Sequence, residues 1–136
     1  MSTRLICLTN YGYKHFIENM LYSIRECNLS HIMTVFCLDK YVKEYLIEKY
    51  PECEYIIIDN TSSENMIDFQ ENGLNHVVFY KMKAIYISLQ KYERVLFIDG
   101  DIVLYKNPLD HLEQMLELNK KDILFQTDLL PNDLNY

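Results

Sequence analysis

The segment RVLFIDGDIVL, residues 94–104, decides the fold that this sequence predicts. Its first part, Arg94–Ile98, is a short and predominantly apolar run, which is typical of a buried strand in a parallel sheet. The run ends at Asp99-Gly100-Asp101, a polar triplet that predicts a tight turn at the carboxyl end of the strand. Ligands of open α/β sheets bind beyond the carboxyl ends of the strands, so this turn is a candidate binding site.

Similar apolar runs alternate with helical patterns on both sides of this segment. Further strands are expected at Arg4–Thr9, Ile32–Leu38, Tyr55–Ile58 and Asp122–Gln126. Helices are expected from apolar residues at helical spacing over Lys14–Asn28, Tyr41–Tyr50, His76–Tyr92 and Leu109–Leu118. The alternation predicts an α/β fold with a mostly parallel sheet and helices on both faces. The polar stretch Asp59–Asn75 is long for a compact domain and is expected to be a flexible or ligand-covering loop.

Length and composition are those of one ordinary globular domain. The chain has 136 residues, of which 49% are hydrophobic and 24% are charged, so we expect residues 1–136 to form a single domain around one core. The net charge of −7, with no cluster of Lys and Arg, argues against a nucleic-acid-binding surface. If the chain binds an anionic ligand, a divalent cation is the natural candidate to attract it.

The cysteines and the N-terminus favour a reducing, cytoplasmic setting. None of the four cysteines forms a CxxC pair, and Cys7 and Cys37 fall inside apolar runs, where a free thiol behaves as a small hydrophobe. The N-terminus MSTRLICLTN lacks the apolar stretch of a signal peptide, and no run reaches transmembrane length. We therefore expect a cytoplasmic protein without a membrane span.

Asp99 and Asp101 are the sharpest candidates for chemistry. Carboxylates that alternate across one glycine can both reach one side of a tight turn, and oxygen ligands of this kind suit Mg²⁺ or Mn²⁺. A cation held there would bridge the oxygens of a diphosphate and stabilise a leaving group as its charge develops. The alternative is a purely structural turn in which Gly100 supplies a positive φ angle.

Three stretches, in the right order, resemble glycosyltransferases with the GT-A fold. The segment Leu96–Leu104, with the Asn107-Pro108 turn after it, resembles their D-x-D segment. The similarity is closest to family 8 enzymes, such as glycogenin and bacterial galactosyltransferases, and to the related nucleotide-diphospho-sugar transferases. Tyr80–Tyr92 is similar to the helix before that segment, and Leu8-Thr9-Asn10 with Tyr13 resembles the family's first strand and nucleotide loop. The resemblance implies a GT-A, Rossmann-like sheet.

The resemblance also implies roles for particular residues. Those that would bind the nucleotide come from the first strand and its loop, namely Leu8, Thr9, Asn10 and Tyr13. Tyr13 would stack on a uracil-like ring, and Asp99 and Asp101, on either side of Gly100, would hold Mn²⁺ or Mg²⁺. Lys83, which stands 16 positions before Asp99, would contact the diphosphate or the transferred sugar. The implied reaction is metal-dependent transfer from a UDP-sugar to an unknown sugar, lipid or protein acceptor.

Other polar residues have plainer interpretations. Asp39 follows the second predicted strand and is expected to cap the next helix rather than to bind a ligand. None of the four histidines stands at metal-ligand spacing, and the C-terminal His motif that supplies a third metal ligand in family 8 has no counterpart. The resemblance covers about the first half of such a catalytic domain. Three alternatives follow for a chain of this length: a truncated piece, a shortened gene product, or an unusually small relative that forms a homo-oligomer to complete its site.

Two other functions fit parts of the pattern. The same half domain could serve as a binding or interaction module without catalytic activity. Hydrolysis of the donor, or sugar transfer, by the pure protein would exclude this alternative. Haloacid-dehalogenase-like phosphatases also have an apolar strand that leads into Asp-x-Asp, where one Asp is the nucleophile. In that class the motif follows the first strand, whereas here only 35 residues follow Asp101.

Overall fold

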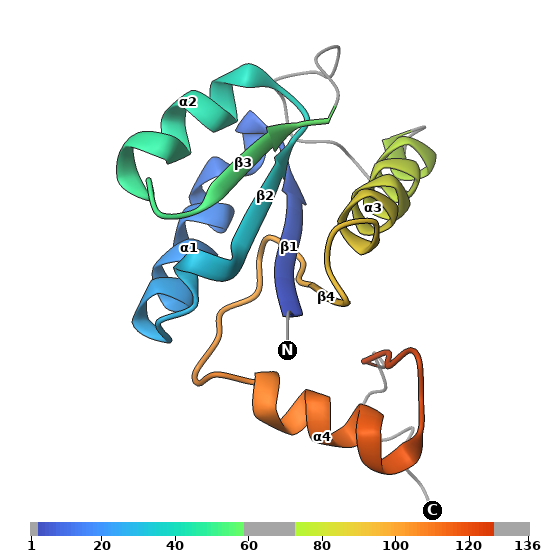
Figure 1. The fold of residues 1–136 in the computed structure, drawn as a ribbon. Helices are drawn as coiled ribbons and strands as arrows, with labels where there is room; N and C mark the ends of the chain where they lie inside the picture. The colour runs from blue at the N-terminus through green and yellow to red at the C-terminus, as the bar shows by residue number, and fades with distance from the viewer. Residues whose placement is uncertain (1–2, 59–72, 127–136) are drawn as a thin grey trace, which may run out of the picture.

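The computed structural model describes residues 3–58 and 73–126 of the chain, and in this part it is an α/β protein (Figure 1). The strands are β1 (Thr3–Thr9), β2 (Met33–Cys37), β3 (Glu54–Ile57) and β4 (Arg94–Phe97). The α-helices are α1 (Lys14–Glu26), α2 (Lys40–Lys49), α3 (Gly73–Leu89) and α4 (Leu109–Asn119). Short 3-10 helices lie at Tyr11–Tyr13 and Ser30–Ile32.

The described strands form one parallel sheet in the order β3-β2-β1-β4. β1 lies at the centre and pairs with β2 on one side, where Cys7 faces Val35, and with β4 on the other, where Leu5 faces Leu96. The chain first builds outward from β1 to β3 and then crosses back through α3 to add β4. The strand order therefore reverses between β1 and β4, which makes their carboxyl ends the place where such sheets bind ligands.

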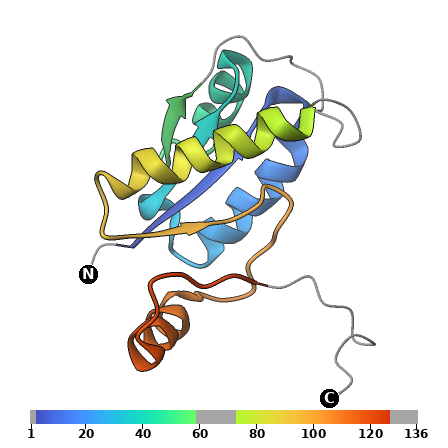
Figure 2. The same ribbon diagram turned by 90° about the vertical axis from the view of Figure 1, so that its right-hand side faces the viewer.

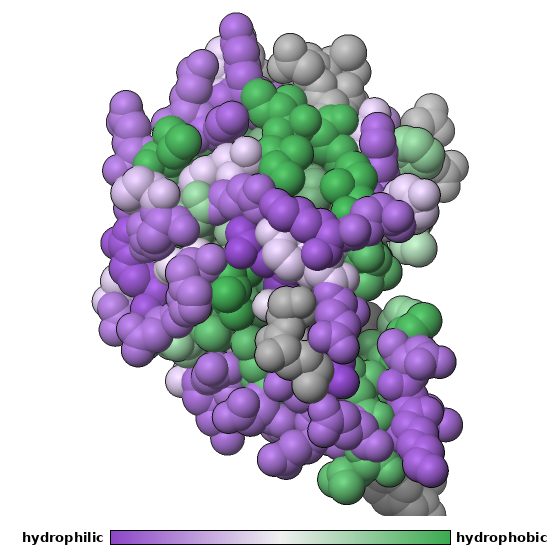
Figure 3. Space-filling view, viewed as in Figure 1, coloured by the Kyte–Doolittle hydropathy of each residue, from purple (hydrophilic) through white to green (hydrophobic). Residues whose placement is uncertain are grey.

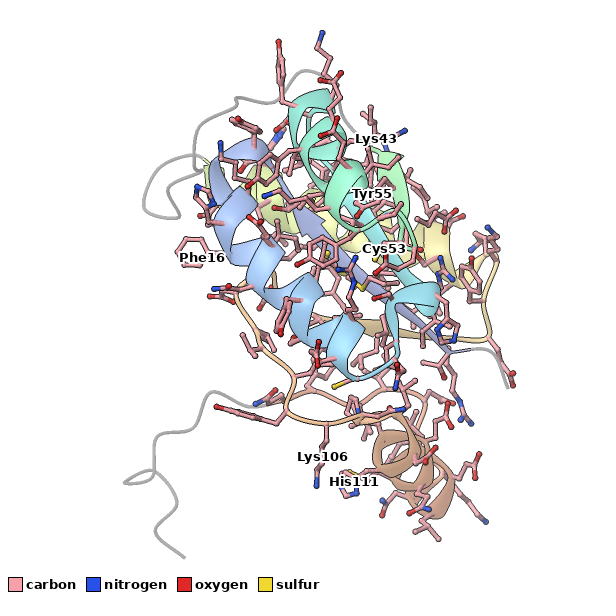
Figure 4. The ribbon with its side chains drawn as sticks, turned by 90° about the vertical axis from the view of Figure 1, so that its left-hand side faces the viewer. Phe16, Lys43, Cys53, Tyr55, Lys106 and His111 are labelled. Carbon is pink, nitrogen blue, oxygen red and sulfur yellow. The ribbon has the colours of Figure 1, made fainter. Side chains whose placement is uncertain are left out.

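Helices cover both faces of this sheet, as the apolar strands predicted. α1 and α2 lie side by side on one face (Figure 4), and α3 crosses the other (Figure 2). Leu5 and Cys7 of β1 point into the larger core with α1 and α2, whereas Ile6 between them points toward Ala84 of α3. Because successive side chains of a strand face opposite ways, both faces of β1 are buried, which explains its unbroken apolar run.

Most predicted elements are confirmed, with small shifts at their ends. α3 extends from Gly73 to Leu89 instead of from His76 to Tyr92. Beyond Leu89 the N–H groups of Lys91 and Tyr92 both donate to the Ser88 carbonyl, at 3.0 and 2.8 Å, and the chain then returns to β4. Of the predicted loop Asp59–Asn75, residues 59–72 lie outside the described residues, and residues 73–75 belong to α3.

The predicted strand Asp122–Gln126 is wrong, because these residues form neither helix nor strand. Lys120, just before them, has a φ of 49°, and this left-handed residue ends α4 and turns the chain back. The apolar side chains that suggested a strand face solvent: Ile123 is 66% exposed and Phe125 is 86% exposed. An apolar run becomes a strand only where a neighbouring strand offers its hydrogen-bonding edge, and none of the described strands pairs with this one.

α4 lies beyond the amino ends of the strands, at the opposite end of the molecule from the carboxyl ends of β1 and β4 (Figure 1). The Thr3 hydroxyl donates to Glu113 Oε1 at 2.6 Å, and Arg94 Nη2 lies 3.4 Å from Glu117 Oε1. All four cysteines fall in the described part of the chain and are free thiols. None of the described helices combines the length and the apolar composition that a bilayer crossing requires.

Candidate functional site

A cleft of about 200 Å³ opens at the carboxyl ends of β1 and β4. Its lining residues come from both strand ends, from the end of β2 and from α3: Leu8, Thr9, Asn10, Tyr13, Leu38, Val77, Lys81, Asp99, Gly100 and Asp101. Apart from Lys83, every site residue predicted from the sequence lines this cleft. The structure thus brings together residues that lie about 90 positions apart in the sequence, at the point where the strand order reverses.

The end of β1 supplies one side of the cleft. Thr9 and Asn10 are buried, and the Thr9 carbonyl accepts a hydrogen bond from the Leu38 N–H at 2.9 Å, which extends the pairing of β1 with β2. The Tyr13 N–H then donates to the Asn10 carbonyl at 3.1 Å. This bond closes the 3-10 helix after β1 and holds Tyr13 at the cleft rather than along the strand direction.

Asp39 fixes that turn from behind. Its Oδ1 accepts from the Val42 N–H at 2.8 Å, which confirms the predicted cap of α2, and its Oδ2 accepts from the Tyr11 N–H, also at 2.8 Å. The side chain is buried and does not line the cleft. One carboxylate therefore joins the start of α2 to the loop that carries Tyr13, and it acts on the site by positioning that loop.

The acidic turn after β4 supplies the other side. The Ile102 N–H donates to the Asp99 carbonyl at 3.1 Å, which closes a turn over Asp99-Gly100-Asp101. Gly100 does not have a positive φ, so the positive φ angle predicted for it in the structural alternative is wrong. A Cβ at this position would lie 3.6 Å from Ile17 Cδ1, an ordinary van der Waals distance. The turn is thus built by its hydrogen bond and by the surrounding packing, without a conformation reserved for glycine.

The chain that leaves the turn is anchored on α1. The Leu104 N–H donates to the hydroxyl of Ser23 at 3.0 Å, and this buried hydroxyl donates in turn to the Met20 carbonyl at 2.7 Å. Leu104 itself packs against the larger core. The turn is therefore held on both sides, by β4 before it and by Ser23 after it, which keeps Asp99 and Asp101 beside the cleft.

The lysine that lines the cleft is Lys81, whereas the predicted Lys83 is not among the lining residues, and its role stays a prediction. Lys81 Nζ lies 2.7 Å from Asp99 Oδ1, whereas Lys83 is exposed and its Nζ lies 5.6 Å from the centre of the Tyr80 ring. Residues two apart on an α-helix point in nearly opposite directions, since each residue turns the helix by about 100°. The small buried residues Ala84 and Ser88 mark the inward face of α3, and Lys81 lies on it at helical spacing.

The two carboxylates provide a donor set that suits a hard divalent cation. Mg²⁺ is commonly held by one or two carboxylates, with the remaining positions filled by substrate phosphates and water. The Lys81 ammonium already forms an ion pair with Asp99 Oδ1. Within residues 3–58 and 73–126, no three or more His, Cys, Asp or Glu side chains converge to hold a metal ion. His111, for example, lies on α4 at the far end of the molecule (Figure 4).

The fold and the site together define an α/β domain with an acidic turn at the switch point of its parallel sheet. The chain belongs to the nucleotide-diphospho-sugar transferase family, whose family model matches residues 28–135. It has no significant match among curated proteins or among solved structures. Family membership indicates a sugar transferase with a nucleotide sugar as its partner, and it favours this function over the phosphatase. The closer resemblance to family 8 stays a prediction.

Proposed function

We propose that this chain forms the donor-binding part of a metal-dependent glycosyltransferase that uses a UDP-sugar. The family match supports sugar transfer at the coarse level. The observation that carries the finer proposal is the meeting of the acidic turn and the nucleotide loop in one cleft. Neither feature alone points to a nucleotide sugar, but together they provide separate places for its base and for its diphosphate.

The end of β1 would receive the nucleoside. Leu8, Leu38 and Val77 give this side of the cleft apolar walls, Thr9 and Asn10 contribute polar groups, and Tyr13 contributes an aromatic ring. A flat base is suited to apolar walls and an aromatic face, and polar groups at the strand end would bond the ribose or the edge of the base. The cleft of about 200 Å³ is smaller than typical pockets for drug-sized ligands, so it accounts for part of the donor.

Asp99 and Asp101 would hold Mn²⁺ or Mg²⁺ at the diphosphate end. A diphosphate brought against two carboxylates is repelled, and the net charge of −7 adds to this repulsion. When bound, the cation would neutralise the phosphate oxygens and stabilise the departing diphosphate. The chain's own contribution is positional: β4 and the bond from Leu104 to Ser23 fix the acidic turn, and Asp39 fixes the loop of Tyr13.

The test is calorimetric titration with UDP and several UDP-sugars, with and without Mn²⁺, on the wild type, Asp101→Asn and Asp110→Asn. Asp110 is an exposed carboxylate of α4 outside the cleft, so its variant makes the same change of charge away from the site. We expect UDP binding that requires Mn²⁺ and weakens at least about tenfold in Asp101→Asn only, because a charged ligand contact is lost.

Two results would contradict the proposal. The first is UDP binding that is the same with and without Mn²⁺. The second is equal loss of affinity in Asp101→Asn and Asp110→Asn. Release of UDP from a UDP-sugar by the purified chain, measured with Mn²⁺ present, then separates an enzyme from a binding module: an enzyme would release UDP, and Asp101→Asn would stop it.

A further inference from the structure

We infer that Lys81 and the divalent cation exchange at Asp99: Lys81 holds this carboxylate in the ligand-free chain and passes to the diphosphate when the cation binds. The inference rests on the proposed function and adds a residue that the sequence pattern did not select. It gives the chain a means of coupling metal binding to diphosphate binding, so that each strengthens the other.

The geometry places all the groups involved within one cleft. Lys81 comes from α3 and Asp99 from the turn after β4, and the 2.7 Å contact between Nζ and Oδ1 joins these two elements across the cleft. Their side chains are 31% and 55% exposed, so water and ions reach the pair. Lys81 Nζ also lies 5.4 Å from the centre of the Phe97 ring, so the ammonium has an aromatic face beside it as well as Asp99.

The charges favour the exchange. A metal-ligand bond from a carboxylate to Mg²⁺ is about 2.1 Å long, so a cation on Asp99 Oδ1 would lie close to an ammonium that stays at its present position. Like charges at that separation repel strongly, and this repulsion favours movement of the Lys81 ammonium away from Asp99 Oδ1. The ammonium then needs a new anionic partner, and a diphosphate bound to the same cation provides one in the same cleft.

This exchange has opposite effects on the two ligands. In the empty chain Lys81 competes with the cation for Asp99 and lowers its affinity. In the donor complex Lys81 adds a charge-assisted bond to the diphosphate. Metal and diphosphate are then linked by a coupling free energy, which must act equally in both directions. Lys83 has no part in this, because it faces away from the cleft.

The experiment compares Lys81→Met with Lys83→Met, which remove the same charge from the same helix. We expect Mn²⁺ affinity without nucleotide to rise about two- to fivefold in Lys81→Met beyond its change in Lys83→Met, as the loss of a partly exposed ion pair allows. At saturating Mn²⁺, UDP affinity should fall about tenfold in Lys81→Met only. Calorimetry measures both.

Chemical labelling gives a second measurement on the unmodified chain. Acetylation of lysines, followed by fragment mass spectrometry, reads Lys81 and Lys83 within one peptide. Mn²⁺ alone should raise the rate at Lys81 relative to Lys83, because the ammonium is released from Asp99, and Asp99→Asn should do the same without metal. Addition of UDP with Mn²⁺ should lower the rate at Lys81 again.

The experiments distinguish a failure of the exchange from a failure of the proposed function. The exchange is overturned, and the proposed function stands, if UDP binding depends on the metal but Lys81→Met and Lys83→Met behave identically and Mn²⁺ does not change the labelling of Lys81. A larger loss of UDP affinity in Lys83→Met overturns the exchange in favour of the sequence prediction. If the wild type binds neither Mn²⁺ nor UDP, the proposed function fails and the exchange fails with it.

Discussion

At the scale of single residues, Gly100 separates the two carboxylates of the cleft yet has a backbone conformation open to other residues. Its φ is not positive, and a Cβ would meet Ile17 Cδ1 at 3.6 Å and the Leu8 carbonyl oxygen at 3.9 Å. These are contacts that a methyl group makes in any well-packed protein. The glycine is therefore not required by the fold of the ligand-free chain.

We expect Gly100→Ala to leave the free energy of unfolding unchanged or to raise it by up to about 1 kcal/mol, because alanine reduces the entropy of the unfolded chain. Urea unfolding of the variant and the wild type measures this difference. A loss of about 2 kcal/mol or more would show that the turn lacks room for a side chain. If the variant is as stable as the wild type but binds UDP more weakly, the ligand approaches the backbone at Gly100.

At the scale of elements, a charged row ties β1, β2 and β3 together on the face that α3 covers. Arg4 Nη2 and the Thr34 hydroxyl both bond Glu54 Oε2, at 2.9 and 2.8 Å, and Lys91 Nζ lies 3.7 Å from its other oxygen. Burial by itself raises the pKa of the Glu54 carboxyl. The hydrogen bond from Thr34 and the charges of Lys91 and Arg4 outweigh it, and the pKa lies below the ordinary value.

This row predicts a loss of stability in acid. A carboxyl whose pKa is lower in the folded state than in the unfolded state stabilises the fold at neutral pH, and that contribution is lost as the pH falls below about 4.5. Glu54→Gln should cost about 1 kcal/mol at pH 7, since the pair is partly exposed, and much less near pH 3. Urea unfolding at both pH values measures this. An equal cost at both would contradict the role of the charge.

The sequence predicted elements well where local pattern decides them and poorly where a partner decides them. The apolar runs of β1 and β4 and the cap at Asp39 depend on neighbours along the chain, and the structure has them. Residues 122–126 have a strand's composition, but no strand in the described part of the chain pairs with them. Lys83 was chosen by its distance along the sequence, whereas the helix face that Ala84 and Ser88 define selects Lys81.

At the scale of the whole molecule, burial is uneven. The sheet with α1 and α2 holds the fully buried side chains of the larger core, whereas apolar side chains reach the surface beside α3 and near α4 (Figure 3). On α3, Phe79, Met82 and Tyr86 are each more than 60% exposed. Because stability follows buried contacts, the elements should open at different free energies.

α4 should be the least stable of the described helices. It has no buried residue, while α1 has five. Two polar contacts, from Thr3 to Glu113 and from Arg94 to Glu117, tie it to the sheet, and the second is long at 3.4 Å. Apolar support comes from Leu109 at its start, which packs against the larger core. Such contacts give a local opening free energy well below that of the whole domain.

Amide hydrogen exchange measures this difference residue by residue. We expect the amides of α4 to exchange at least about a hundredfold faster than those of α1, which corresponds to about 3 kcal/mol between local and global opening. Glu113→Ala should speed exchange in α4 without a change in the urea midpoint, because the bond to Thr3 holds the helix and not the core. Glu48 is an exposed glutamate of α2, and Glu48→Ala serves as the matched control. Equal protection of α4 and α1 would mean that the amino ends of β1 and β4 bind α4 into one cooperative unit, and the carboxylates of the cleft would then be coupled to it through β4.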